Sequence, residues 1–381
     1  MMVCSALWSH ARMSVEGTVL PCCRWEEEGL RKNSKAPKIS DGIQSAIDSD
    51  YFNSVRERML AGEQLSECRQ CIEEEKHDIP SMREQLNDKY SQYIGKKPKL
   101  RYIELAFSTH CNLACRMCNE DYSSKWKLIN NPKLTADTSI DAFDLENYDV
   151  DLSELDMIKA VGGEPFLSKN HYDYLDKLIN QSNNPKGITL IYHTNGTIFP
   201  NKNIIDYWKK LKKVQIIVSV DAYGELNTYL RPGSSWKKLN ETIDKFKNIE
   251  GVNLRLGTYA VITSLNVLQL PKHIEWAIET FGAMGGGNFD VLDYPEHLSI
   301  ANLATEEKDK IRISINRMKD EMRDTKLMKS RHAKYISILF DMFEEALNKN
   351  PDNTYTFEDI AKEEHKLDKY FKQDFWDIIQ V

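Results

Sequence analysis

Three cysteines, Cys111, Cys115 and Cys118, lie close together in the stretch "STHCNLACRMCNEDY", with the spacing Cys-x3-Cys-x2-Cys. Thiolates grouped this closely favour a zinc site or an iron–sulfur cluster, and both usually take four ligands. No fourth Cys or His follows at the spacing typical of zinc sites, and the adjacent His110 is too near in sequence to reach around the same ion. The motif therefore predicts a metal group with one open position, as catalytic metal sites have.

All eight cysteines of the 381-residue chain lie within its first 118 residues. Core thiols with no shared task would be spread more evenly, so this distribution indicates a metal-binding N-terminal third. The first residues show no basic leader followed by an apolar stretch, so we expect no export, no disulfides and a cytoplasmic protein.

Composition excludes two classes of function. The chain has 51 basic and 58 acidic residues and a net charge of −7, which argues against general nucleic-acid binding. The sequence contains no apolar run of about 18 residues, so we expect no membrane span.

From residue 101 onward, strand-like segments alternate with helix-like ones. Buried parallel strands read as apolar runs, and strand–helix units in series imply a parallel sheet with right-handed crossovers. Six units predict an α/β fold, a partial (β/α)6 TIM-like barrel. The expected strands are 101–108, 156–163, 188–196, 214–221, 252–263 and 289–295, and the expected helices are 168–182, 200–213, 236–249 and 268–282.

Three regions follow from this pattern: a cysteine-rich module at 1–95, the barrel at 96–298 and a helical extension at 299–381. The glycine-rich segment 282–288 is expected to be a loop, since it lacks the strand–turn–helix context of a phosphate cradle. Two amphipathic helices are predicted in the extension. Their apolar faces comprise Ile311, Ile315, Met318 and Met322 in one, and Ile336, Leu339, Phe340, Phe343 and Leu347 in the other.

The cysteine motif follows the first barrel strand, and ligands in parallel α/β folds bind at the carboxyl ends of the strands. In this position the motif resembles that of the radical S-adenosylmethionine (SAM) enzymes. The resemblance implies that Cys111, Cys115 and Cys118 hold a [4Fe–4S] cluster and that SAM fills the open position through its amino and carboxylate groups. Reduction would then split SAM into methionine and a 5′-deoxyadenosyl radical, which abstracts hydrogen from a substrate.

Companion motifs follow the later strands. The stretch "VGGEPFL" (161–167) resembles the Gly-Gly-Glu-Pro motif of this family, which implies that Glu164 accepts a hydrogen bond from the ammonium group of SAM. A Gly-Gly turn with a Glu N-cap is the structural alternative. The implied SAM contacts are Gly162, Gly163, Glu164, Pro165, Asn195, Ser219, Asp221 and Asn266.

The N-terminal cysteines resemble the SPASM/twitch accessory domains of radical SAM enzymes. Cys4, Cys22, Cys68 and Cys71 would hold a second, auxiliary [4Fe–4S] cluster, and Cys23 could replace Cys22. The chain departs from the family pattern in two ways: the module precedes the barrel, and its cysteines suffice for only one cluster. Zinc is the alternative metal for this tetrad.

The resemblance implies a radical SAM enzyme that modifies a peptide or protein side chain, with a reductant such as flavodoxin or ferredoxin. A radical SAM dehydrogenase or rearrangement enzyme acting on a sugar, aminocyclitol or nucleoside is the alternative. A zinc-bearing binding module without catalysis is disfavoured by the intact triad with Gly-Gly-Glu-Pro. Asp221, Tyr223 and Asp293 are candidate proton donors or acceptors near strand ends, although polar residues there more often serve structure.

Overall fold

The sheet of this protein has eight strands. The structure, a computed structural model, describes residues 3–25, 35–76, 78, 80–134, 154–282, 288–323 and 333–379. The strands lie in the order β2-β1-β3-β4-β5-β6-β7-β8, and all neighbours are parallel except β1 and β2. Their bounds are β1 (His10–Met13), β2 (Val19–Leu20), β3 (Tyr102–Ala106), β4 (Met157–Val161), β5 (Thr189–Thr194), β6 (Lys213–Ser219), β7 (Leu254–Ile262) and β8 (Asn288–Val291).

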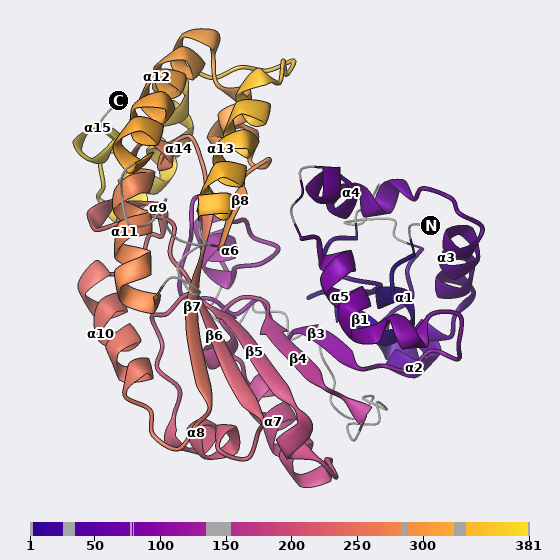
Figure 1. The fold of residues 1–381 in the computed structure, drawn as a ribbon. Helices are drawn as coiled ribbons and strands as arrows, with labels where there is room; N and C mark the ends of the chain where they lie inside the picture. Colours follow the sequence, from indigo (N-terminus) through magenta and orange to yellow (C-terminus); the bar gives the residue numbers. More distant parts are fainter. Residues whose placement is uncertain are drawn as a thin grey trace.

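The six predicted barrel strands are confirmed as β3 to β8, in sequence order and parallel (Figure 1). Among the described residues β8 does not pair with β2, so the sheet stays open as a partial barrel. The α/β fold class is therefore confirmed.

Helices cover the outer face of this sheet. Val214, Ile216 and Val218 of β6 are fully buried there, against the aromatic rings of Trp208 and Phe246 among others. The four predicted helices are confirmed as α7 (Lys169–Gln181), α8 (Lys202–Trp208), α10 (Trp236–Lys247) and α11 (Leu270–Phe281). Two further helices, α6 (Ser124–Asn130) and α9 (Glu225–Leu230), were not predicted.

The opposite, concave face of the sheet carries charged side chains. Glu104 on β3 lies between Arg12 on β1 and Lys159 on β4, at 3.5 and 2.9 Å. Burial alone would raise the pKa of Glu104, but the charges of Lys159 and Arg12 lower it to about 2. The concave face is therefore suited to polar contents.

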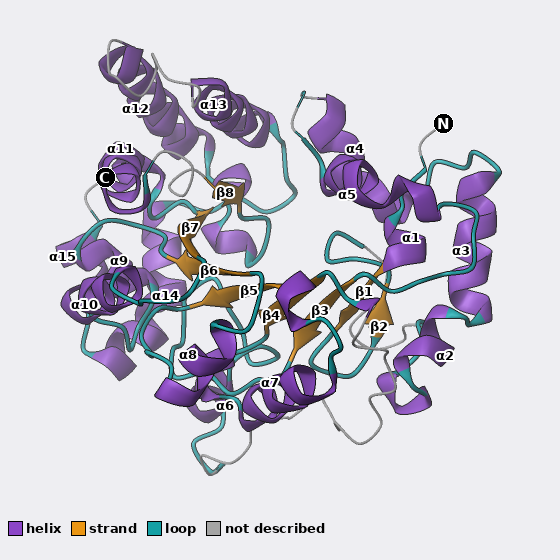
Figure 2. Cartoon of the chain, turned by 60° about the horizontal axis from the view of Figure 1, so that its bottom comes forward, coloured by secondary structure: helices purple, strands orange, loops and turns teal. Residues whose placement is uncertain are grey.

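The N-terminal segment extends the barrel sheet, because β1 pairs in parallel with β3. Figure 2 shows its helices gathered beside β1 and β2. The segment also has its own core, which includes Trp8, Val55 and Leu86. Its helices are α1 (Ala6–Ser9), α2 (Ile43–Ile47), α3 (Asp50–Leu60), α4 (Arg69–Lys76) and α5 (Met82–Tyr90). The proposed boundary between residues 95 and 96 stays a prediction.

The C-terminal helices lie away from the N-terminal segment (Figures 1 and 2). They are α12 (Thr305–Arg323), α13 (Ala333–Asn348), α14 (Phe357–Phe371) and α15 (Phe375–Ile378). The predicted faces are buried at Ile311, Ile315, Met318, Leu339, Phe340, Phe343 and Leu347. The side chains of Met322 and Ile336, and residues 283–287 of the expected loop, lie outside the described residues. Within the described part of the chain, no helix is both long and apolar enough to cross a bilayer.

Candidate active site at the cysteine loop

The three clustered cysteines lie on the loop 107–123 that joins β3 to α6, at the carboxyl end of β3. All three are partly buried. The start of α6 closes this loop: the Ser123 hydroxyl donates to the Leu113 carbonyl at 2.7 Å, and the Trp126 indole donates to the Cys115 carbonyl at 2.9 Å. We call residues 107–123 the cysteine loop.

The end of α9 and the residues that follow it form a second support. The Ala114 amide donates to the Pro232 carbonyl at 3.2 Å, and the Arg116 amide donates to the Leu230 carbonyl at 2.9 Å. The middle of the cysteine loop is thus paired with backbone that follows β6, which explains why the unpredicted α9 matters to the site.

The end of β4 forms a third support. The Gly163 amide donates to the Ser108 carbonyl at 2.8 Å, and the Glu164 amide donates to the His110 carbonyl at 2.7 Å. A Cβ on Gly163 would lie 2.3 Å from that His110 oxygen, and one on Gly162 would lie 2.7 Å from that of Ser108. Gly162 also has a φ of +115°. Both glycines therefore allow β4 to lie directly against the cysteine loop, a packing role that the sequence did not indicate.

Glu164 is almost wholly buried and ties β4 to β5. One carboxylate oxygen accepts from the Thr194 hydroxyl at 2.8 Å and from the Phe166 amide at 3.2 Å, and the other accepts from the Asn195 amide at 2.8 Å. Burial raises the pKa of Glu164 to about 7, although these hydrogen bonds oppose the rise. The N-cap geometry of the structural alternative is thus present, at the 3-10 turn Pro165–Leu167. A role of Glu164 toward SAM stays a prediction.

Asn195, at the end of β5, lies against the cysteine loop as well. Its side-chain nitrogen Nδ2 is 3.0 Å from the side-chain oxygen of Asn112 and 3.9 Å from the Cys111 sulfur. Its side-chain oxygen accepts from the Thr197 amide at 2.9 Å. Asn195 therefore reaches the first cysteine, and its contact with SAM stays a prediction.

Asp221 is buried after β6, where it holds an arginine that sequence reasoning missed. Its carboxylate accepts from Arg231 Nε at 2.6 Å and from the Val261 amide at 2.8 Å. Arg231 in turn places Nη1 3.6 Å from the Cys115 sulfur. Asp221 thus acts on the cysteine loop through Arg231, and no local pattern indicates this pair because it depends on α9.

The remaining predicted residues divide into two groups. Asn266 is buried and donates to the Asp221 carbonyl at 2.9 Å, and Ser219 is half-buried at the end of β6. Tyr223 is 44% exposed and packs against Trp236, and the Asp293 side chain is 78% exposed beside Lys349. The structure brings Ser219 and Asn266 to the strand ends but leaves Tyr223 and Asp293 at the surface.

The donor chemistry of the cysteine loop fits an iron–sulfur group. Burial raises the pKa values of Cys111 and Cys118 to about 12, so these thiols are protonated at neutral pH and must lose protons when metal binds. Among the described residues, no group of three or more His, Cys, Asp or Glu side chains converges on a position for one metal ion. In a cluster each thiolate binds a different iron, so its ligands surround a volume instead of sharing one point.

The predicted auxiliary tetrad is brought together at one cavity. Cys4, Cys22, Cys68 and Cys71 line a small space of about 20 Å³, with Arg24, Met82 and Arg83 among its other walls. Cys23 does not line this cavity, and its sulfur lies 3.2 Å from that of Met82. Thiols are the ligands that soft metal groups take, and metal binding by this tetrad stays a prediction.

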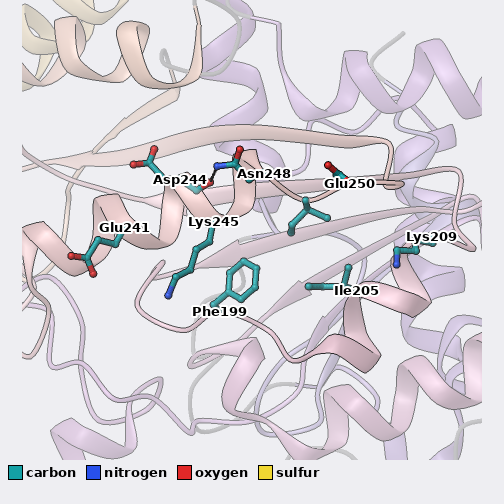
Figure 3. Close-up of a pocket in the computed structure, with 9 residues that line it drawn as sticks. Phe199, Ile205, Lys209, Glu241, Asp244, Lys245, Asn248 and Glu250 are labelled. Carbon is teal, nitrogen blue, oxygen red and sulfur yellow. Dashed lines mark hydrogen bonds between the residues drawn. The ribbon is translucent and has the colours of Figure 1, made fainter.

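A larger cavity lies away from both cysteine sets. Its volume is about 790 Å³, and Figure 3 shows Phe199, Lys209 and Lys245 among the side chains that line it. Lys209 and Glu250 lie a few residues before β6 and β7, so this cavity lies at the amino ends of the strands, opposite the cysteine loop. It takes no part in the site.

Residues 105–277, a little under half of the 381-residue chain, match the family model described as the radical SAM superfamily. The match supports a radical SAM domain in this chain, and it supports the prediction that the chain is an enzyme. The matched segment begins on β3 and ends on α11, so it contains the cysteine loop and the ends of β4 to β7. No curated protein matches the chain.

Among solved structures the chain is similar to anSMEcpe with bound AdoMet, at 18% identity and a TM-score of 0.39, over 59% of this chain and 62% of that one. It is also similar to Streptococcus suis SuiB bound to S-adenosylmethionine, at 16% identity and a TM-score of 0.34, over 58% of this chain and 47% of that one. The chain is similar as well to TYW1 with a lysine-pyruvate adduct bound, at 16% identity and a TM-score of 0.32, over 57% of this chain and 73% of that one. The chain thus spans less than two thirds of the first two proteins, and similarities of this size identify no substrate.

Replacing Gly163 with alanine should destabilise the protein by about 3 kcal/mol, because the new methyl group meets the fixed backbone oxygen of His110. Gly62→Ala is the control: its φ is +87° but no atom lies within 4 Å, so only backbone strain of about 1 kcal/mol is expected. Urea denaturation of both variants measures the difference. A loss for Gly163→Ala no greater than that for Gly62→Ala would contradict the close packing.

Glu164 should make stability depend on pH. Its pKa is about 7 in the folded chain against an ordinary value of 4.5, so the folded state binds more protons between these values. The contribution of Glu164 to the free energy of unfolding is therefore complete below pH 4.5. It falls by about 3 kcal/mol in total as the pH rises through 7. Urea denaturation from pH 4.5 to 8 should show a flatter profile for Glu164→Gln than for the wild type. Parallel profiles would show that Glu164 is already ionised at pH 5.

Proposed function

We propose that this chain is a radical SAM enzyme that abstracts hydrogen from a peptide or protein side chain. The observation that carries the proposal is the arrangement of the cysteine loop: three thiols follow β3 and are held by residues from the ends of β4, β5 and β6. The match of residues 105–277 to the radical SAM superfamily supports it. When bound, the [4Fe–4S] cluster supplies the electron that splits SAM into methionine and the 5′-deoxyadenosyl radical.

The proposed roles of the side chains follow from their positions. Cys111, Cys115 and Cys118 would hold the cluster and would leave its fourth position to SAM. The strand-end residues around them, from Gly162 to Pro165 with Asn195, Ser219 and Asn266, form the side of the pocket for SAM. Asp221 serves the same site by holding Arg231 beside Cys115.

The concave face of the sheet is the proposed place of the substrate. It carries Glu104, Lys159 and Arg12, with Tyr259 and Asp290 further along, where the Tyr259 hydroxyl donates to Asp290 at 3.0 Å. Such a surface suits a polar substrate, because it offers charged and hydroxyl groups as hydrogen-bond partners. The resemblance of the N-terminal cysteines to SPASM/twitch domains favours a peptide or protein.

The N-terminal tetrad is the proposed site of a second, auxiliary [4Fe–4S] cluster with four protein ligands. A site closed by four thiolates does not bind substrate directly, so its proposed task is electron transfer or support of the module. A reductant such as flavodoxin or ferredoxin is the proposed electron donor. A cytoplasmic location belongs to the same proposal, because free thiols and iron–sulfur groups persist in reducing compartments.

Anaerobically reconstituted protein should cleave SAM to 5′-deoxyadenosine when dithionite is added. Cys111→Ala, Cys115→Ala or Cys118→Ala should each abolish this, because each removes one ligand of the open cluster. Chromatography of the products measures the reaction, and Cys23→Ala serves as a matched control that should retain it. Cleavage by all three single variants at the wild-type rate would refute the proposed function.

The variant lacking Cys111, Cys115 and Cys118 should keep about half of the iron, since one of two clusters remains. In that background Cys22→Ala should lose the rest and Cys23→Ala should keep it, because only Cys22 lines the common cavity. Iron and zinc analysis with Mössbauer spectra measures both. Stoichiometric zinc in place of the retained iron would refute the auxiliary cluster, and retention by Cys22→Ala would assign the ligand to Cys23.

A further inference from the structure

The side chain of Arg116, between the second and third cysteines of the loop, is completely buried against the C-terminal helix α14. Its guanidinium donates to the carboxylate of Glu364, to Asp368 at 2.6 Å and to Gln373 at 3.0 Å. It also donates to the Tyr229 carbonyl at 2.8 Å and lies 3.6 Å from the centre of the Tyr229 ring. Every partner but Tyr229 lies more than 240 residues away in sequence.

This arrangement is built by helix geometry. Glu364 and Asp368 are four residues apart on α14, so their carboxylates lie on one face of the helix and reach the same guanidinium. Both are buried, at 4% and 6% exposure. A buried guanidinium requires charged partners, and a buried pair of carboxylates requires a cation, so neither side tolerates the loss of the other. His297 also faces Glu364, at 2.8 Å.

An apolar contact joins the same two elements. Ala114 of the cysteine loop and Ile129 of α6 form a small core with Leu367 of α14, and Trp126 and Phe371 pack against it. Trp126 also donates to the Cys115 carbonyl. Helix α14 thus touches the cysteine loop both directly and through α6.

We propose that α14 is a brace for the cysteine loop and that Arg116 is a positioning residue, held by Glu364 and Asp368 so that the neighbouring Cys115 and Cys118 keep the geometry for the metal group. The metal part of this inference rests on the proposed function, whereas the brace itself does not. Helix α14 lies outside the segment that matches the radical SAM superfamily. The cluster site of this chain therefore extends beyond that domain into its C-terminal helices.

The test compares Glu364→Gln/Asp368→Asn with the control Glu358→Gln/Glu363→Gln, which removes the same charge from exposed positions of the same helix. Cys68→Ala and Cys71→Ala are included in every chain, so that the loop cysteines account for the iron. Transfer of iron to a chelator is followed after anaerobic reconstitution. The brace variant should release iron at least tenfold faster than the control, and equal release would overturn the coupling of the brace to the metal group.

A second measurement needs no metal. Alkylation of Cys115 and Cys118 by iodoacetamide in metal-free full-length chain, read by peptide mass spectrometry, should be at least fivefold faster in the brace variant. Cys4 in the same chains should react at an unchanged rate, which separates loosening of the loop from general unfolding. If the double variant does not fold, the single Asp368→Asn variant should show an intermediate rate. Equal alkylation in folded brace and control chains would overturn the brace. If the control variant itself binds no iron after reconstitution, the proposed function is overturned instead.

Discussion

The candidate site depends on one backbone pairing, between the end of β4 and the start of the cysteine loop. Two amides of the Gly-Gly-Glu segment donate to the carbonyls of Ser108 and His110. Such an approach leaves no room for a Cβ at Gly162 or Gly163. The loop is therefore fixed at its base by the same strand end that bears Glu164, and the carboxylate of Glu164 carries the connection on to β5. Three successive strand ends are joined in this way before any ligand is considered.

Parallel topology explains why separate motifs meet here. In a parallel sheet every strand delivers its carboxyl end to one edge, so residues that follow each strand become neighbours although tens of residues separate them. Asn195 after β5, Asp221 after β6 and Asn266 after β7 are brought to the same edge of the sheet by this rule. Tyr223 and Asp293 show its limit: being near a strand end does not decide which way a side chain points, and both lie at the surface.

The positions of β3 to β8 could be predicted because buried strands have long apolar runs and the helices between them have regular faces. Strand β1 could not, since the short stretch "HARM" has no long apolar run and becomes a strand by pairing with β3 and β2. Likewise, Gly162 and Gly163 were predictable as a motif, but their contact with the loop backbone was not. Arg116 stands inside the cysteine motif, yet its partners Glu364 and Asp368 are too distant in sequence for any local pattern to indicate them.

Two arginines flank Cys115, and their partners differ in a way that separates their effects. Arg116 meets two carboxylates, so its charge is neutralised inside the protein and its influence on the loop is mechanical. Arg231 meets one carboxylate among the described residues, that of Asp221, and directs its Nη1 to the Cys115 sulfur. Burial raises the pKa of Cys115, and the charge of Arg231 acts against that rise. A cation held next to a thiolate favours the negative form.

Because Asp221 also accepts from the Val261 amide, the position of this cation is fixed by the ends of β6 and β7. The sheet thus supplies both the geometry of the cysteine loop and the charge beside its central thiol.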